Sequence, residues 1–274
     1  MKLLICMDME GISGVSRWEH VTPGHAEYER FRRIMTADVN AAIAGAFAAG
    51  VEDVVVSDGH WDGQNVLIEE LDPRARLNSG NSAPLAMVQG ADTKPDAAFL
   101  IGYHARAGAH PAVLDHTWSS VRVADLMING RVSGESGLNG SVLGYFGVPV
   151  LLVSGDQTAT AEAADWMPGI ETAVVKNATS RTSADCLPIE TAQAVIREKA
   201  ELAVRRFLQG QAPQPVKTVA PVKMSVRFNT SAQADGAEVT PNAVRADGRT
   251  IEFESADMLE AYFMFRSVVG MANR

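Results

Sequence analysis

The chain has 274 residues, 46% of them hydrophobic, and a formal net charge of −9 at pH 7. This length supports one large domain or two modest ones with an ample core. The acidic balance argues against nucleic acid as a partner, because phosphate binding needs a basic surface, and it disfavours attachment to an anionic membrane.

Signals for export or membrane insertion are missing from the sequence. No run reaches the roughly 18 apolar residues of a membrane span, and acidic residues follow the short apolar start MKLLICMDMEG at once. Cys6 and Cys186 lie far apart and form no C-x-x-C pair, which fits a reducing compartment. We therefore expect a cytoplasmic protein with no membrane partner.

Apolar runs rich in β-branched residues alternate along the chain with segments of helical periodicity. The patterns predict strands at 2–7, 51–60, 95–104, 120–129, 148–156, 220–228 and 250–254. They predict helices at 26–49, 137–147, 158–166, 189–208 and 256–272. This alternation is typical of a three-layer α/β fold, with a mostly parallel sheet and helices on both faces.

A Pro- and Gln-rich segment, QAPQPVK at 211–217, suggests a boundary in the chain. We expect residues 1–212 to form the α/β metal-binding catalytic domain. Residues 213–274 then form a smaller α+β part packed on it.

Acidic and imidazole side chains follow three of the predicted strands. The first strand ends in Asp8-Met9-Glu10, the second in His60 and the third in His104. Ligands bind at the carboxyl ends of strands in open α/β sheets, so we expect these side chains to meet at one edge. Glu135, in GESGLNG before a predicted helix, is a further candidate.

These two imidazoles and three carboxylates form a mixed nitrogen and oxygen donor set without a thiolate. Such a set suits zinc and, less specifically, manganese, iron or cobalt. Five protein ligands are too many for one catalytic zinc but suit two metal ions that share a carboxylate. A pair of this kind can activate water and polarise a carbonyl.

His116 is the third histidine of interest, because a short loop separates it from His104. A non-ligand imidazole in the same pocket would act as a general acid or base, or orient the substrate. His20, His25 and His110 lie in polar contexts and are expected on the surface.

Several other polar residues have two interpretations each. Asp156 ends a strand and is expected to cap the next helix. The start of the helix at 137–139 either contacts substrate through backbone N–H groups or is an ordinary helix start. Lys176 and Arg181 either recognise a peptide carboxylate or are solvated.

Signatures of other enzyme classes are absent from the sequence. It contains neither a G-x-x-x-x-G-K-[ST] loop nor a G-x-G-x-x-G segment after a strand, so nucleotide binding is not indicated. It lacks the G-x-S-x-G nucleophile elbow of serine hydrolases and the H-E-x-x-H helix of many zinc proteases.

Six segments, taken in order, resemble the zinc D-aminopeptidases of the dipeptide-transport-operon type. They are MDMEGISG (7–14), VSDGH (56–60), GYHARA (102–107), GESGLNG (134–140), VKNATSR (175–181) and DMLEAY (257–262). Together they run from the first strand to the last helix, so the resemblance covers nearly the whole chain.

The resemblance implies an aminopeptidase with two zinc ions per subunit that acts on short peptides with an N-terminal D-amino acid. It implies that Asp8 bridges the zinc ions and that Glu10, His60, His104 and Glu135 are the other ligands. It also implies that His116 is catalytic, and that the subunits form a ring-like homo-oligomer, a decamer in the characterised type.

Two other functions are compatible with the residues. A site of three carboxylates and two imidazoles also serves other binuclear metal hydrolases, such as an L-aminopeptidase, an amidase or a phosphoesterase. A non-catalytic peptide-binding protein for uptake is the second alternative, and the missing export signal counts against it.

Overall fold

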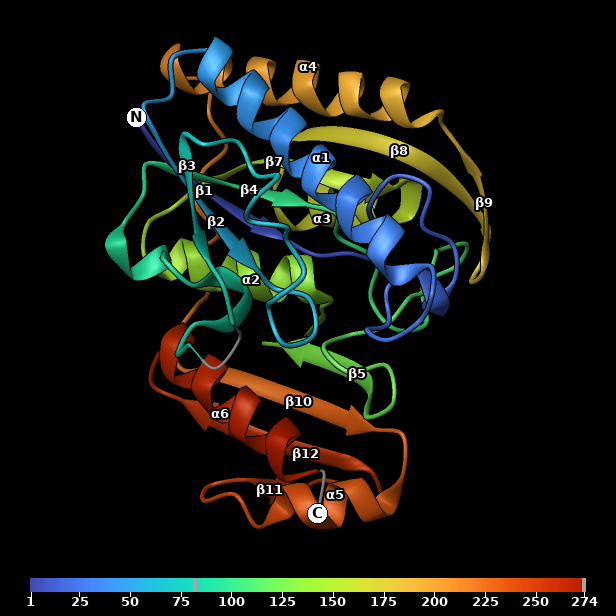
Figure 1. Ribbon diagram of the computed structural model, residues 1–274. Helices are drawn as coiled ribbons and strands as arrows, with labels where there is room; N and C mark the ends of the chain where they lie inside the picture. The colour runs from blue at the N-terminus through green and yellow to red at the C-terminus, as the bar shows by residue number, and fades with distance from the viewer. Residues whose placement is uncertain (81–82, 273–274) are drawn as a thin grey trace.

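A parallel sheet forms the centre of the protein (Figure 1). Across residues 1–80 and 83–272, which the computed structural model describes, this sheet has seven strands. In spatial order they are β3 (Ala75–Asn78), β2 (Asp53–Asp58), β1 (Lys2–Met7), β4 (Ala97–Ile101), β7 (Val150–Asp156), β8 (Glu171–Ser180) and β9 (Ser183–Cys186). Neighbouring strands run parallel, except that β8 and β9 form an antiparallel hairpin.

Helices cover both faces of this sheet (Figure 1). The helices α1 (Tyr28–Ala48) and α4 (Ile189–Leu208) pack together on one face, and α2 (Glu135–Tyr145) and α3 (Gln157–Trp166) lie on the other. Strand β1 serves both layers, because alternate side chains point to opposite faces of a strand. Its Leu3, Ile5 and Met7 join the core with α1 and α4, and its Leu4 and Cys6 join the core with α2. The predicted three-layer arrangement is confirmed.

A second, antiparallel sheet lies beside the α2 layer (Figure 1). Its strands are β11 (Val244–Arg245), β12 (Thr250–Ser255), β10 (Val222–Phe228), β5 (Val123–Ile128) and β6 (Arg131–Val132), with α5 (Ser231–Glu238) and α6 (Met258–Met271) packed on them. This is the smaller α+β part expected near the C-terminus. The sheet also takes β5 and β6 from the chain before residue 212, and the boundary at 212/213 stays a prediction.

Two groups of elements were not predicted from the sequence. The first group consists of the edge strands β3 and β9 and of β8, the neighbour of β9. The second group consists of the short elements β6, β11, α5 and the 3₁₀ turns η1 (Trp18–His20), η2 (Ala86–Val88) and η3 (Ala91–Thr93). Strands β3 and β9 lie at the edges of the sheet, where polar, partly exposed residues weaken the apolar pattern that marks a strand.

In the described ranges, no helix has the length and apolar character needed to cross a membrane.

The carboxyl ends of β1, β2 and β4 lie level with one another. Met7 of β1 pairs with Asp58 of β2 on one side and with Ile101 of β4 on the other. The backbones beyond these ends approach closely, and the Gly11 N–H donates to the Gly102 carbonyl at 2.8 Å. A Cβ on Gly11 would collide with a neighbouring carbonyl, and Gly102 has a φ of +75°, so both positions need glycine. The chain beyond each strand therefore leaves from the same edge.

Candidate metal centre

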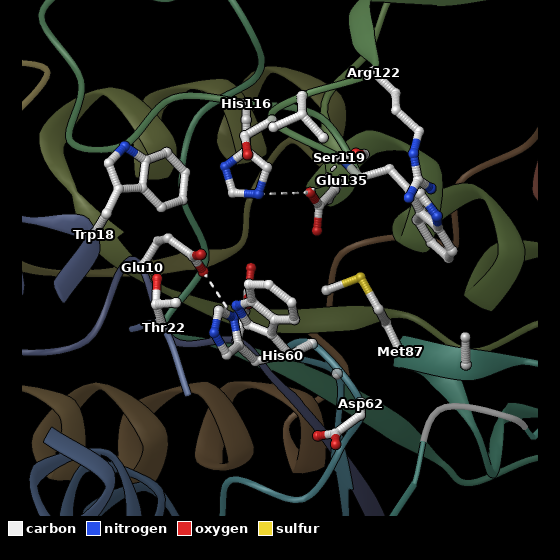
Figure 2. A pocket seen from close by; sticks show the side chains of 17 residues that line it. Glu10, Trp18, Thr22, His60, Asp62, Met87, His116, Ser119, Arg122 and Glu135 are labelled. Atoms are coloured by element: carbon white, nitrogen blue, oxygen red, sulfur yellow. Dashed lines mark hydrogen bonds and ion pairs between the residues drawn. The ribbon is translucent and has the colours of Figure 1, made fainter. Parts of the chain in front are cut away.

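The five predicted ligands meet at this edge of the sheet. Asp8 and Glu10 follow β1, His60 follows β2, His104 follows β4, and Glu135 is the first residue of α2. All five are buried, with exposed fractions from 2% to 5%. Figure 2 shows Glu10, His60 and Glu135 around one cavity. Asp8, Glu10, His60 and His104 therefore lie together at the strand ends, where the rule for open α/β sheets predicts that ligand-binding groups gather.

Asp8 lies between two groups of side chains. Its Oδ1 is 3.3 Å from Nδ1 of His60, and its Oδ2 is 3.3 Å from Nε2 of His104. The same His60 nitrogen is 3.1 Å from Oε2 of Glu10, and the same His104 nitrogen is 3.2 Å from Oε1 of Glu135. Each carboxylate oxygen of Asp8 thus faces a separate imidazole and a separate second carboxylate.

Hydrogen bonds to the backbone fix the tautomers of both imidazoles. Nε2 of His60 lies 2.7 Å from the Val21 carbonyl oxygen, and Nδ1 of His104 lies 2.9 Å from the Ala105 carbonyl oxygen. A carbonyl can only accept, so these nitrogens carry hydrogen. In the neutral ring, the other nitrogen then directs its lone pair at the carboxylates. Metal-binding histidines are commonly oriented in this way.

The electrostatics of the group favour a positive charge at its centre. Burial alone would lower the pKa of His60 and of His104, but the carboxylates of Glu10, Asp8 and Glu135 outweigh burial and raise both pKa values well above the ordinary range. Burial would raise the pKa of Asp8, yet the neighbouring imidazoles of His104 and His60 hold it well below its usual value.

Buried atoms without hydrogen-bond partners test whether a metal fits here. Oδ2 of Asp8, Oε2 of Glu10 and Nε2 of His104 have none among the described residues. Leaving such atoms unpaired is costly, and the cost for a buried carboxylate is greater still. Ligand atoms of Asp8, Glu10 and His104 lie within 4.8 Å of one another, as do those of His104, His116 and Glu135. The residues present fit bound cations.

His116 lies beside these groups in the loop that follows β4. Its ring stacks on His104, with centroids 3.9 Å apart and an interplanar angle of 11°, and Trp18 packs edge-on at 5.5 Å. Nδ1 is 2.8 Å from the Leu114 carbonyl oxygen, so it carries hydrogen, while Nε2 is 3.9 Å from Oε1 of Glu135. Burial, followed by the charge of His104, lowers the pKa of this imidazole.

A cavity of about 600 Å³ opens beside the cluster (Figure 2). One wall carries Asp8, Glu10, His60, His116 and Glu135. Other lining side chains are Trp18, Trp61, Met87, Trp118 and Arg122. The volume lies in the ordinary range of small-molecule sites, and a few polar groups on largely apolar walls are typical of them.

This second wall was not predicted from the sequence. Trp118 and Arg122 belong to the segment before β5, and Met87 lies in η2. Arg122 falls within the predicted strand at 120–129, but no pattern there indicates a site, and only the folded chain brings these three residues opposite the strand ends. The N–H of Trp118 donates to Oε1 of Glu135 at 2.6 Å, so this wall also orients one of the acidic side chains.

Both interpretations of Lys176 from the sequence are wrong. Lys176 is buried in β8, where its ammonium group donates to the carbonyl oxygens of Glu10, Ile12 and Val15 at 2.6, 2.8 and 2.8 Å. Burial lowers its pKa to about 8, although nearby Asp156 opposes the effect. The side chain therefore fixes the backbone that follows β1, is shielded from solvent and does not line the cavity described above.

The other polar candidates have structural roles. Arg181 is paired with Asp115 at 2.8 Å and does not line the cavity. Asp156 caps α3 by accepting from two backbone N–H groups, as predicted. Residues 137–139 lie buried inside α2, which agrees with an ordinary helix start. His25 and His110 are exposed as expected, whereas His20 is half-buried against Phe31.

A parallel α/β sheet that gathers buried imidazoles and carboxylates at its ligand-binding edge is an arrangement characteristic of metal-dependent hydrolases. Comparison with known proteins narrows this class. The family model described as D-aminopeptidase, peptidase family M55, matches residues 1–267. The chain belongs to this D-aminopeptidase family, which confirms the resemblance inferred from the six sequence segments.

Two individual relatives cover almost the whole chain. A D-aminopeptidase from Bacillus subtilis (strain 168) is 40% identical over 266 residues, or 96% of this chain and 94% of that protein. The solved structure of the zinc-dependent D-aminopeptidase DppA from Bacillus subtilis, described as a self-compartmentalizing protease, matches with a TM-score of 0.95 and 38% identity. That match covers 100% of this chain and 98% of the other.

The role of Lys176 leads to a prediction about stability. Lys176→Met should lower the free energy of unfolding by about 2–3 kcal/mol, because three buried carbonyls lose their donor. Urea unfolding in the presence of a chelator measures this without a contribution from bound metal. Lys199→Met, which removes a partly exposed ion pair with Glu171, is the matched control and should cost less than about 1 kcal/mol. Equal losses in the two variants would contradict the role assigned to Lys176.

Proposed function

We propose that this protein is a zinc-dependent aminopeptidase that releases N-terminal D-amino acids from short peptides. The observation that carries the proposal is the buried group centred on Asp8, which opens onto a cavity of peptide size. Membership of the D-aminopeptidase family supports the reaction and its stereochemistry. The zinc-dependent relative of known structure supports the metal.

We assign the ligands of two zinc ions as follows. Asp8 would bridge them, Glu10 and His60 would complete one site, and His104 and Glu135 would complete the other. The assignment is supported by the two oxygens of Asp8, which face the two imidazoles separately. When bound, zinc supplies an activated water nucleophile and a Lewis acid for the scissile carbonyl.

His116 is the residue assigned to proton transfer. Its Nδ1–H donates to the Leu114 carbonyl, so in the neutral ring Nε2 is free to accept a proton. Stacking on His104 and the edge of Trp18 hold the ring plane at the cavity wall. Nε2 would take a proton from the attacking water and deliver it to the leaving amine.

We also propose that the protein is a homo-oligomer in the cytoplasm, in the form of a ring-like decamer. The self-compartmentalizing relative supports assembly of subunits. Exposed apolar side chains such as Ile68, Val121 and Val219 provide surface for subunit contacts. The free thiols of Cys6 and Cys186 support a reducing compartment.

Hydrolysis of matched chromogenic substrates tests the proposed reaction. The purified protein should cleave D-alanine p-nitroanilide at least ~10-fold faster than the L-enantiomer, a discrimination of about 1.4 kcal/mol. A chelator should abolish the activity, and added zinc should restore it. Preference for the L-substrate would overturn the D-specificity. Absence of cleavage by zinc-loaded protein would overturn the aminopeptidase.

Replacement of His116 separates a catalytic role from a metal-binding role. His116→Ala should reduce kcat by ~10²–10⁴-fold, the usual contribution of a general acid or base, and should retain the wild-type zinc content. His110→Ala, at an exposed position, is the control and should leave both quantities unchanged. Loss of zinc from His116→Ala would identify His116 as a ligand, and wild-type turnover would remove it from the reaction.

A further inference from the structure

The cavity contains a cation that the reaction described above does not use. Arg122 is the only arginine or lysine among the described residues that line the cavity. In Figure 2 it lies on the wall opposite Glu10. The other charged lining groups are the candidate metal ligands, His116, and Asp62 near the rim.

The guanidinium of Arg122 has no partner within the described parts of the chain. No ion pair, side-chain hydrogen bond or aromatic contact involves it there, whereas Arg181 is already paired and Lys176 is buried elsewhere. Burial lowers its pKa, and no acidic neighbour offsets that effect. Arginines in half-buried positions usually pair with a carboxylate or a phosphate, so the missing partner points to a ligand.

The backbone of Arg122 is held firmly next to the candidate metal centre. Its N–H donates to the Ser119 carbonyl at 3.1 Å, and its carbonyl accepts from the Asn229 N–H at 2.8 Å. The turn keeps the Cα atoms of Ser119 and Arg122 within about 7 Å. One residue before the turn, the Trp118 N–H donates to Glu135. The backbone that carries this cation is thus fixed four residues along the chain from the contact between Trp118 and Glu135.

We propose that Arg122 binds the C-terminal carboxylate of the substrate and thereby selects peptides of two or three residues. This assignment rests on the proposed aminopeptidase function. A guanidinium can form two parallel hydrogen bonds to a carboxylate, which fixes the orientation of that end of the peptide. Each additional residue moves the carboxylate roughly 3.5 Å farther from the scissile bond, so a fixed cation selects for length.

The test compares a peptide acid with its amide. Wild-type protein should favour D-alanylglycine over D-alanylglycinamide by ~10–100-fold in kcat/KM, the usual effect of a charge-assisted hydrogen bond. Arg122→Gln should remove this preference by raising KM for the acid, and should leave the amide within about 3-fold of wild type. Arg122→Lys should restore part of the preference. Arg227→Gln, at an exposed position of β10, is the control and should behave as wild type.

Binding to zinc-loaded His116→Ala protein gives a readout that does not need turnover. Calorimetry should find that the acid binds ~10–100-fold more tightly than the amide, and that Arg122→Gln in this background removes the difference. Equal losses for acid and amide, or no loss for either, would overturn the role of Arg122. If wild type cleaves neither peptide, the proposed function fails, and the calorimetric ratio still decides whether Arg122 binds the carboxylate.

Discussion

Three carboxylates and two imidazoles are buried together where strands β1, β2 and β4 end, and this burial constrains the surrounding structure. Buried carboxylates are expensive unless positive charge compensates them. Two backbone carbonyls accept from the outer nitrogens of the imidazoles, so that in the neutral rings the inner nitrogens direct their lone pairs at the carboxylates. The site is therefore organised for bound cations, and Asp8 is its centre because each of its oxygens serves one half.

The framework around Asp8 is correspondingly rigid. Gly11 and Gly102 allow the chain beyond β1 to pass directly against the chain beyond β4. Lys176 then ties the carbonyls of Glu10, Ile12 and Val15 to β8 on the far side. A buried ammonium group is a costly anchor, and three good acceptors offset that cost. The acidic side chains are thus presented by backbone that has little freedom to relax.

The sequence was sufficient to predict the three-layer α/β architecture and most of the side chains that meet at the edge of its sheet, for a physical reason. Apolar strands end in polar residues, and parallel strands bring those ends together, so Asp8, Glu10, His60 and His104 could be placed without coordinates. Edge strands β3 and β9 were not predicted, because their partly exposed residues lack the apolar pattern that marks a strand. Arg122 was not predicted as a site residue, because a turn in the folded chain places it at the cavity and no sequence motif marks it. Lys176 was misjudged because local sequence does not reveal burial against a distant loop.

The proposed bridging of two zinc ions by Asp8 can be tested directly by crystallography. Crystals of the zinc-loaded protein should give two anomalous peaks per chain at the zinc absorption edge, on opposite sides of the Asp8 carboxylate. One peak should contact Glu10 and His60, and the other His104 and Glu135. A single peak, or two peaks that Asp8 does not bridge, would contradict the account.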